Sequence, residues 1–273
     1  MDQTARWNGT AGQAWVEAQG LLDRMFRPFE RLLVEAVLRT GGDVLDIGCG
    51  TGGTTLAMTR ALGLNGDCTG VDISEPMIKV ARARAEAEGS HAFFIRADAQ
   101  SHDFEPGSAD VIVSRFGVMF FDDPVAAFVN LRRAAKPNAG LNLIAWRSAA
   151  DNPFMTTAEH AAAPLLPGIP SREPDVPGQF AFGNPDRVDA ILRKSGWADI
   201  DLQPLDVVCS FPESELEFYF TRLGIIAPLL READEPVRAR VIDTVRAAFD
   251  PYVDGTEVRF TAACWMVGAR ARE

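Results

Sequence analysis

The chain has 273 residues, 47% of them hydrophobic and 24% charged, which is the balance of a globular protein with a sizeable core. Its 27 basic and 38 acidic side chains give a formal net charge of −11. This disfavours nucleic acid and anionic membranes as partners, because phosphate binding needs a positive surface. The first residues lack the apolar core of a signal peptide, and no uncharged apolar run approaches membrane-spanning length.

The spacing of the cysteines and histidines indicates the cellular compartment and whether a metal is bound. The four cysteines form no CxxC pair, which indicates reduced thiols in a cytoplasmic protein. The three histidines are not spaced as metal ligands usually are, so we expect no metal site.

The first 150 residues predict a helical cap followed by an α/β core. Apolar residues recur at helical spacing over residues 1–40, which we interpret as an N-terminal helical cap. Residues 41–150 then alternate short apolar strands with helices, which is typical of parallel βαβ units in a doubly wound sheet. The expected strands cover 43–47, 67–73, 92–96, 110–114 and 141–146, and the expected helices cover 54–62, 77–88 and 124–135.

Beyond residue 150 this alternation breaks. Residues 151–182 carry six prolines, including Pro174, and we expect an irregular lid there. Residues 183–273 complete the core, with a helix over 185–195, strands over 200–211 and 258–267, and a helical insertion over 213–250.

A glycine-rich turn follows the first expected strand. Gly48, Gly50 and Gly53 satisfy G-x-G-x-x-G, and Asp72 ends the next strand. By spacing alone this pattern fits a dinucleotide site in which the acid binds a ribose. Asp46 disfavours that interpretation, because a buried acid two residues before the first glycine would repel phosphates. The same acid would favour a cationic ligand.

Four ordered motifs carry a more specific resemblance. They are Val-Leu-Asp-Ile-Gly-Cys-Gly-Thr-Gly at 44–52, Gly-Val-Asp-Ile-Ser at 70–74 with Met77, Ala-Asp-Ala at 97–99, and Ser-Ala-Asp-Val-Ile-Val-Ser at 108–114. With these motifs, the chain over residues 41–147 resembles class I S-adenosylmethionine-dependent methyltransferases, and within them the ubiquinone-biosynthesis-like branch that acts on small molecules. A fifth segment, 131–140, resembles the family's entry to its fifth strand.

The resemblance implies a Rossmann-like, seven-stranded, mostly parallel sheet with a reversed final hairpin and a cofactor site at the carboxyl ends of the strands. The glycine turn would pass beneath the methionine portion, with Asp46 facing the ammonium through water. Asp72 would bind the ribose diol, and Asp98 with the Ala99 N–H would read adenine. The expected cofactor-binding residues are Trp15, Asp46, Gly48, Cys49, Gly50, Thr51, Gly52, Asp72, Ile73, Met77, Asp98, Ala99, Ser114 and Arg115.

Several of these residues have a plainer alternative. Asp72 and Asp98 could cap helices or turns, Met77 could belong to the core, and Cys49 could be only a small residue in the turn. The segment 114–121 should run past the methyl group. There Arg115 either orients a carboxylate of the cofactor or of an acidic substrate, or forms a salt bridge in an outer layer.

Substrate-side residues are expected in the cap, the lid and the helical insertion. Trp15 could cover the sulfonium or adenine, with Trp7 beside it, whereas Phe26 is expected to pack in the core. His160 and Tyr219 are the candidate general bases, alongside Arg115 as a further catalytic candidate. Aromatic and polar residues expected around the acceptor are Phe154, His160, Phe180, Phe182, Phe218, Tyr219, Arg222 and Ile226.

We therefore predict a cytoplasmic enzyme that moves a methyl group from S-adenosylmethionine to an oxygen, nitrogen or carbon atom of a small molecule, by metal-independent in-line displacement. S-adenosylhomocysteine would be the product form of the cofactor. Two alternatives stay open: an NAD(P)-dependent oxidoreductase, and a catalytically silent S-adenosylmethionine-binding protein. The sequence does not distinguish a monomer from a homodimer.

Overall fold

A computed structural model describes residues 2–173 and 176–272, so Pro174 lies outside the described residues. An eight-stranded sheet runs through the molecule in the order β3-β2-β1-β4-β5-β8-β6, with β7 paired to β8 alone. The strands are β1 (Val44–Ile47), β2 (Cys68–Asp72), β3 (Phe93–Arg96), β4 (Ala109–Arg115), β5 (Ala135–Trp146), β6 (Ala198–Pro212), β7 (Val253–Asp254) and β8 (Glu257–Arg270).

The first five strands are parallel, and β8 inserts antiparallel between β5 and β6. This confirms the expected parallel sheet with a reversed final hairpin. The short apolar β1 lies between β2 and β4, and all four of its residues are buried. The predicted count of seven strands was wrong by one, because the chain before β8 pairs with it through the two-residue β7.

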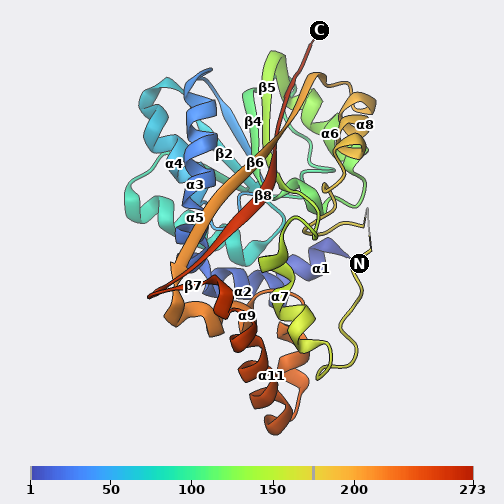
Figure 1. Ribbon diagram of the computed structural model, residues 1–273. Helices are drawn as coiled ribbons and strands as arrows, with labels where there is room; N and C mark the ends of the chain where they lie inside the picture. The colour runs from blue at the N-terminus through green and yellow to red at the C-terminus, as the bar shows by residue number, and fades with distance from the viewer. Residues whose placement is uncertain (1, 174–175, 273) are drawn as a thin grey trace.

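Helices cover both faces of the sheet (Figure 1). One face carries α3 (Gln19–Leu38), α4 (Gly53–Leu62) and α5 (Glu75–Glu88), and the other carries α6 (Pro124–Ala134) and α8 (Pro185–Lys194). Aspartate and asparagine side chains with proline in the first turn begin α6 and α8: Asp123 accepts from Ala126 N–H, and Asn184 from Asp186 N–H. None of the described helices is long and apolar enough to cross a membrane.

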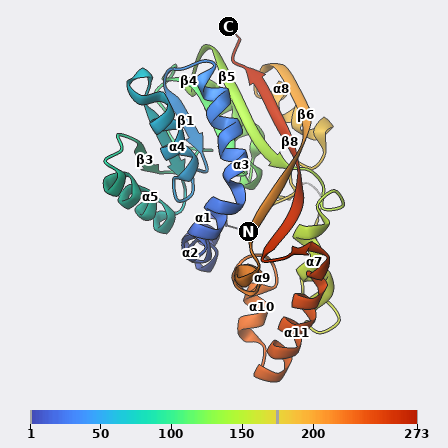
Figure 2. The same cartoon turned by 60° about the vertical axis from the view of Figure 1, so that its left-hand side comes forward.

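The remaining helices lie at or beyond the carboxyl edge of the parallel strands (Figures 1 and 2). The α1–α2 pair lies next to this edge, and α7, α9, α10 and α11 form a group that projects beyond it. These helices are α1 (Gln3–Asn8), α2 (Thr10–Glu17), α7 (Pro153–Ala162), α9 (Leu216–Arg222), α10 (Ala227–Glu232) and α11 (Glu235–Ala248). Single 3-10 turns are Gly63–Asn65, Val118–Phe120, Glu213–Glu215 and Asp250–Tyr252.

Three sequence predictions of continuous elements need correction. The first forty residues form three helices instead of one, since the chain leaves helical geometry at Gly9 and again at Ala18. The stretch expected to be irregular contains α7. The helix expected over 213–249 is divided into α9, α10 and α11, because Gly224 takes a left-handed conformation (φ +86°) and Pro236 starts a new helix.

Candidate active site

The turn between β1 and α4 presents bare backbone at the carboxyl edge of the sheet. Gly48, Gly50 and Gly52 have φ of +67°, +57° and +83°, conformations that strain any side chain-bearing residue. The N–H groups of Gly48 and Cys49 both donate to the carbonyl oxygen of Val71, at 2.8 and 3.1 Å. The turn is therefore anchored to the end of β2.

Asp72 ends β2 directly beside this turn. Its Oδ2 accepts the Gly50 N–H at 2.9 Å, and its Oδ1 accepts the Ser74 N–H at 2.9 Å. Burial raises the pKa of Asp72, and these backbone donors oppose that shift. An ionised carboxylate offers about four acceptor positions. The positions that these backbone bonds leave open remain for a ligand.

The segment after β3 forms the next part of the wall. The Ala97 N–H donates to the carbonyl of Asp72, and Asp98 Oδ1 accepts the Gln100 N–H, both at 2.9 Å. Asn130 Nδ2 holds the Ala99 carbonyl at 3.0 Å from the opposite helix layer. This part of the wall is therefore fixed by bonds to two neighbouring elements.

The loop after β4 closes against the glycine turn. Ser114 Oγ donates to the carbonyl of Ile47 at 2.7 Å and accepts the Gly117 N–H at 3.1 Å. Phe116 has φ +66°, which is rare for a bulky residue, and its ring stacks on Trp146 with centroids 4.7 Å apart. Ser114 thus joins the two loops from beneath, while Phe116 directs the chain between them.

The α1–α2 pair forms the roof over these loops. Asn8 Nδ2 donates to the carbonyl of Ile73 at 3.1 Å, and its Oδ1 accepts the Glu75 N–H at 2.9 Å. Ser74 Oγ donates to the carbonyl of Trp7 at 2.6 Å. The Trp7 ring packs edge-on against Phe120, with centroids 5.0 Å apart. The N-terminal helices are therefore docked on the residues that directly follow Asp72.

Together these elements enclose a cleft of about 870 Å³, its open mouth included. It brings together nine of the expected cofactor-binding residues with side chains of α1 and of the loop after β4. Its lining comprises Asp2, Gln3, Thr4, Trp7, Trp15, Ile47, Gly48, Gly50, Val71, Asp72, Ile73, Met77, Ala97, Asp98, Ala99, Gln100, Arg115, Phe116, Gly117, Phe120, Phe121 and Asp122.

Two buried polar atoms of the cleft lining lack partners among the described residues. They are Nη1 of Arg115, which can only donate, and Oε1 of Gln3, which accepts. A buried polar atom left unpaired costs about 1–3 kcal/mol. A ligand with both acceptor and donor groups would satisfy them, and a zwitterionic nucleoside such as S-adenosylmethionine has both. The residues of the cleft fit that cofactor.

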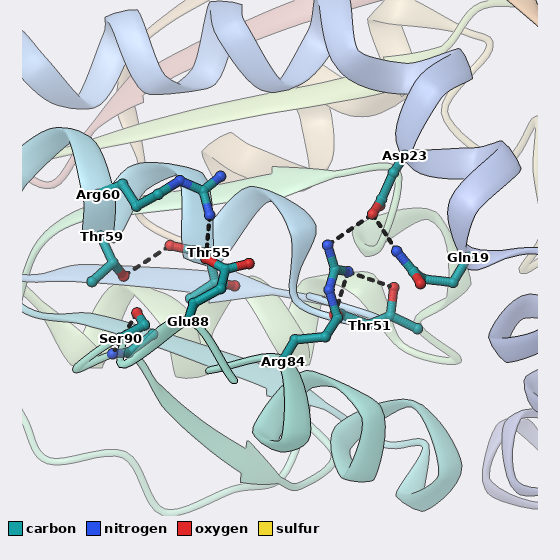
Figure 3. Close-up of polar contacts among 10 residues, drawn as sticks. Gln19, Asp23, Thr51, Thr55, Thr59, Arg60, Arg84, Glu88 and Ser90 are labelled. Atoms are coloured by element: carbon teal, nitrogen blue, oxygen red, sulfur yellow. Dashed lines mark hydrogen bonds and ion pairs between the residues drawn. The ribbon is translucent and has the colours of Figure 1, made fainter. Parts of the chain in front are cut away.

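An ionic network lies behind the glycine turn (Figure 3). Arg84 of α5 donates through Nη1 to the Thr51 carbonyl and through Nη2 to Asp23 of α3, both at 2.8 Å, and Gln19 also bonds Asp23. Beside this network, Asp46 is 1% exposed and accepts from Thr55 Oγ1 at 2.6 Å. Burial raises the pKa of Asp46 to about 6, although Thr55 and Arg115 oppose the shift.

Five expected cofactor-binding residues lie behind the lining of the cleft. Ser114 bridges the two loops as described, Asp46 bonds Thr55, and the Thr51 carbonyl faces Arg84. A Cβ on Gly52 would lie 2.8 Å from the Phe94 ring, and Cys49 packs in the same small apolar cluster. Burial raises the pKa of the Cys49 thiol. These residues shape the turn from behind.

The structure separates the candidate general bases from the cleft. His160 lines a different groove, formed by residues 149–172 together with Ala248. Tyr219 donates to Met155 Sδ at 3.4 Å within an aromatic cluster around Phe154, and burial raises its pKa. The residues of the lid and the helical insertion that were expected around the acceptor do not line this cleft either. None of Phe154, His160, Phe180, Phe182, Phe218, Tyr219, Arg222 and Ile226 is among its described lining residues.

Sequence reasoning missed part of the lining. Asp2, Gln3 and Thr4 reach the cleft because α1 folds back over the sheet, and Gln100 and Asp122 flank it from two loops. A local signal existed only at Asp2, whose side chain accepts from the N–H groups of Thr4 and Ala5 to begin α1. Among the described residues, no group of three or more histidine, cysteine, aspartate or glutamate side chains is arranged to hold a metal ion.

Known proteins share these features. Residues 44–138 match the methyltransferase domain family. The chain is 28% identical over 205 residues to nocamycin O-methyltransferase of Saccharothrix syringae, covering 70% of this chain and 71% of that protein. It is 32% identical over 108 residues to demethylmenaquinone methyltransferase of Staphylococcus aureus, covering 40% of this chain and 44% of that protein. The crystal structure of YcgJ from Bacillus subtilis has the same fold, with a TM-score of 0.57 at 20% identity, over 89% of this chain and 98% of that one.

The sheet order, the glycine turn and the acid at the end of β2 are those of a Rossmann-like domain, in which a nucleotide-like cofactor binds at the carboxyl edge of the sheet. With these matches, residues 44–138 are a methyltransferase domain, and the relatives support a class I S-adenosylmethionine-dependent methyltransferase. The matches support this interpretation over a nicotinamide-dependent oxidoreductase.

Proposed function

We propose that this methyltransferase acts on a small organic acceptor that enters the cleft beneath α1 and α2. The observation that carries the proposal is the enclosure of the cleft: the roof contributes Trp7 and Trp15 to the same lining as the glycine turn, together with the rings of Phe116, Phe120 and Phe121. The names of both curated relatives state small organic acceptors, nocamycin in one and demethylmenaquinone in the other. Four buried free cysteines suit a reducing cytoplasm.

The lining residues have complementary roles toward the cofactor in this proposal. Asp72 accepts from the ribose diol with the acceptor positions that its backbone donors leave open. Asp98 and the Ala99 N–H read the adenine edge, and Ile73 and Met77 pack on its faces. The glycine turn passes under the amino-acid end. Asp46, one layer behind, adds negative charge toward the cationic ligand without touching it.

The bound cofactor supplies a methyl group on a sulfonium, which is activated for in-line displacement. The protein then has to align the acceptor and exclude water. Trp7, Trp15 and Phe120 are placed to exclude water, because their rings pack edge-to-face above the turn. The molecule that fits this space determines whether the methyl group goes to an oxygen, a nitrogen or a carbon atom.

The segments around the core also have proposed roles. Residues 1–40 cap the cofactor, residues 41–150 bind it, and residues 183–273 complete the core, with the insertion 213–250 projecting from it. Residues 151–182 form a lid on the acceptor side. The Gly178 N–H donates to the Met119 carbonyl at 3.0 Å, so this segment abuts the loop that carries Phe120 and Phe121.

The test is transfer of labelled methyl from S-adenosylmethionine across a panel of small phenols, amines, quinols and carboxylic acids, followed by mass spectrometry of the products. We expect a labelled small-molecule product with the native protein and its loss with Asp72→Ala. The matched control is Asp67→Ala, an exposed aspartate just before β2, which should retain transfer. Label appearing only on added protein or nucleic acid would overturn the small-molecule assignment.

A further inference from the structure

Arg115 ends β4 and faces the cleft with hydrogen-bonding capacity unused. Its guanidinium lies 5.7 Å from the centre of the Phe26 ring, and its Nη1 is shielded from solvent. That nitrogen has no partner among the described residues. A guanidinium carries five N–H donors in a planar fork, which suits a carboxylate. The geometry therefore provides donors without an acceptor.

Nearby acids balance the charge of Arg115 without occupying those donors. Asp23, Asp46 and Glu30 all act on the guanidinium electrostatically, and none forms an ion pair with it among the described residues. Asp23 is bonded instead by Arg84 and Gln19, and Asp46 by Thr55. The three acids make a buried positive charge tolerable here, while Nη1 of this cleft-lining residue keeps no partner among the described residues.

The strand order places Arg115 at one end of the cofactor's expected path. Asp72 ends β2, the glycine turn follows β1, and Arg115 ends β4, and these strands are consecutive neighbours in the sheet. Strands lie about 4.8 Å apart, so Asp72 and Arg115 end strands about 10 Å apart. A nucleoside held by its ribose at Asp72 can extend its amino-acid end over the turn and reach Arg115.

We propose that Arg115 binds the carboxylate of the cofactor's amino-acid end, and that the site thereby selects an adenosyl amino acid over an adenosyl thioether without one. This inference rests on the placement of the ribose at Asp72 given above. Of the two carboxylates that Arg115 was expected to orient, it assigns the guanidinium to that of the cofactor and not to that of an acidic acceptor.

The test compares two ligands that share the nucleoside and the thioether: S-adenosylhomocysteine, and 5′-methylthioadenosine, which lacks the amino-acid end. Dissociation constants are measured by calorimetry for the native protein and Arg115→Met, with unfolding midpoints recorded to confirm folding. We expect Arg115→Met to raise the dissociation constant of S-adenosylhomocysteine by about 10- to 100-fold, as for loss of a charge-assisted pair. The dissociation constant of 5′-methylthioadenosine should rise by less than about twofold. Arg115→Lys should recover part of the loss.

Arg147→Met is the matched control. Arg147 is also partly buried and has an unpartnered Nε, but it pairs with Asp206 at 3.2 Å and lies beside Trp265, outside the lining of the cleft. This variant should leave both dissociation constants unchanged. An equal loss for both ligands, or no loss for either, in folded Arg115→Met overturns the inference. Failure of the native protein to bind S-adenosylhomocysteine would overturn the cofactor placement itself.

Discussion

The backbones of Gly48 and Gly117 are in direct contact, since a Cβ on Gly48 would lie only 2.6 Å from the Cα of Gly117. This contact joins the glycine turn after β1 to the loop after β4, and Ser114 reinforces it by bonding both sides. Both loops belong to the cleft wall. The shape of the cofactor site therefore depends on two glycines 69 positions apart in the sequence (117 minus 48).

Gly48→Ala should destabilise the protein by about 2–4 kcal/mol, because left-handed strain and a clash with backbone act together. Gly89→Ala is the matched control. Gly89 has a similar φ, +61°, but open space where its Cβ would be, so about 1 kcal/mol of strain is expected. Urea unfolding of both variants measures the difference. Equal losses would contradict the proposed importance of the backbone contact.

At Phe116, the glycine variant should be at least as stable as the alanine variant, which is the reverse of the usual order. Its φ of +66° favours glycine over alanine, while its ring packs on Trp146, Phe26 and Phe29. Removing the ring should destabilise by about 3–5 kcal/mol in either variant, and Phe116→Gly should equal or exceed Phe116→Ala in stability. At Phe29, inside α3, glycine should instead be less stable than alanine by about 1 kcal/mol. Chemical denaturation of the four variants decides between these orders.

Arg84 should contribute more to stability than its neighbour Arg60 (Figure 3). Arg84 holds both the Thr51 carbonyl and the Asp23 carboxylate, and its side chain is 23% exposed. Arg60 makes an ion pair with Glu88 at 56% exposure. Arg84→Met should destabilise by about 1–3 kcal/mol, and Arg60→Met by less than about 0.5 kcal/mol. Unfolding free energies at low and high salt measure both, and a larger loss at Arg60 would refute this ranking.

Asp46 should make stability fall with rising pH. The folded acid holds its proton up to about pH 6, whereas the unfolded acid releases it near pH 3.8, so the folded state binds more protons between these values. Stability is therefore lost as the pH rises through this window. Asp46→Asn removes this effect and keeps an acceptor for Thr55. Between pH 4.5 and pH 7.5, the unfolding free energy of this variant should rise by about 2 kcal/mol relative to that of the native protein. Urea unfolding at both pH values measures this gain. If the unfolding free energies of the variant and the native protein differ by the same amount at both pH values, the prediction is wrong.

Asn8 should couple the roof to the cofactor. Its amide bonds Ile73 and Glu75 on either side of Ser74, and these two bonds join α1 to the segment after β2 beside the Ser74–Trp7 bond. Asn8→Ala should weaken S-adenosylhomocysteine binding by about 5- to 30-fold, corresponding to two lost hydrogen bonds. Amide exchange over residues 3–17 should rise in parallel. Asn65→Ala, which removes an amide bonded only within its own turn, should change neither measurement. Tight binding with a fast-exchanging α1 would show that the roof is dispensable.

The sequence predicted those parts of the site that are local in the chain. The glycine turn, Asp72 and Asp98 each follow a short apolar strand, and parallel strands bring such positions to one edge. Gln3 was missed because its place in the lining depends on how α1 folds back, which no local pattern encodes.

The residues expected around the acceptor do not line this cleft, for a related reason. Phe154 and Tyr219 resemble pocket residues in composition, but Phe154 stacks on Phe260 at 3.9 Å, and Tyr219 joins the same cluster. Aromatic residues that pack a small helical layer cannot be told from those of a binding site by type alone. Only their tertiary partners distinguish the two.

The docking of α1 has a practical consequence for handling the protein. Asp2 lines the cleft, so any peptide joined upstream of it would start beside the cleft. β8 carries the other terminus to the opposite edge of the sheet (Figure 1). An affinity tag or an immobilising linker therefore belongs after β8, away from the cleft.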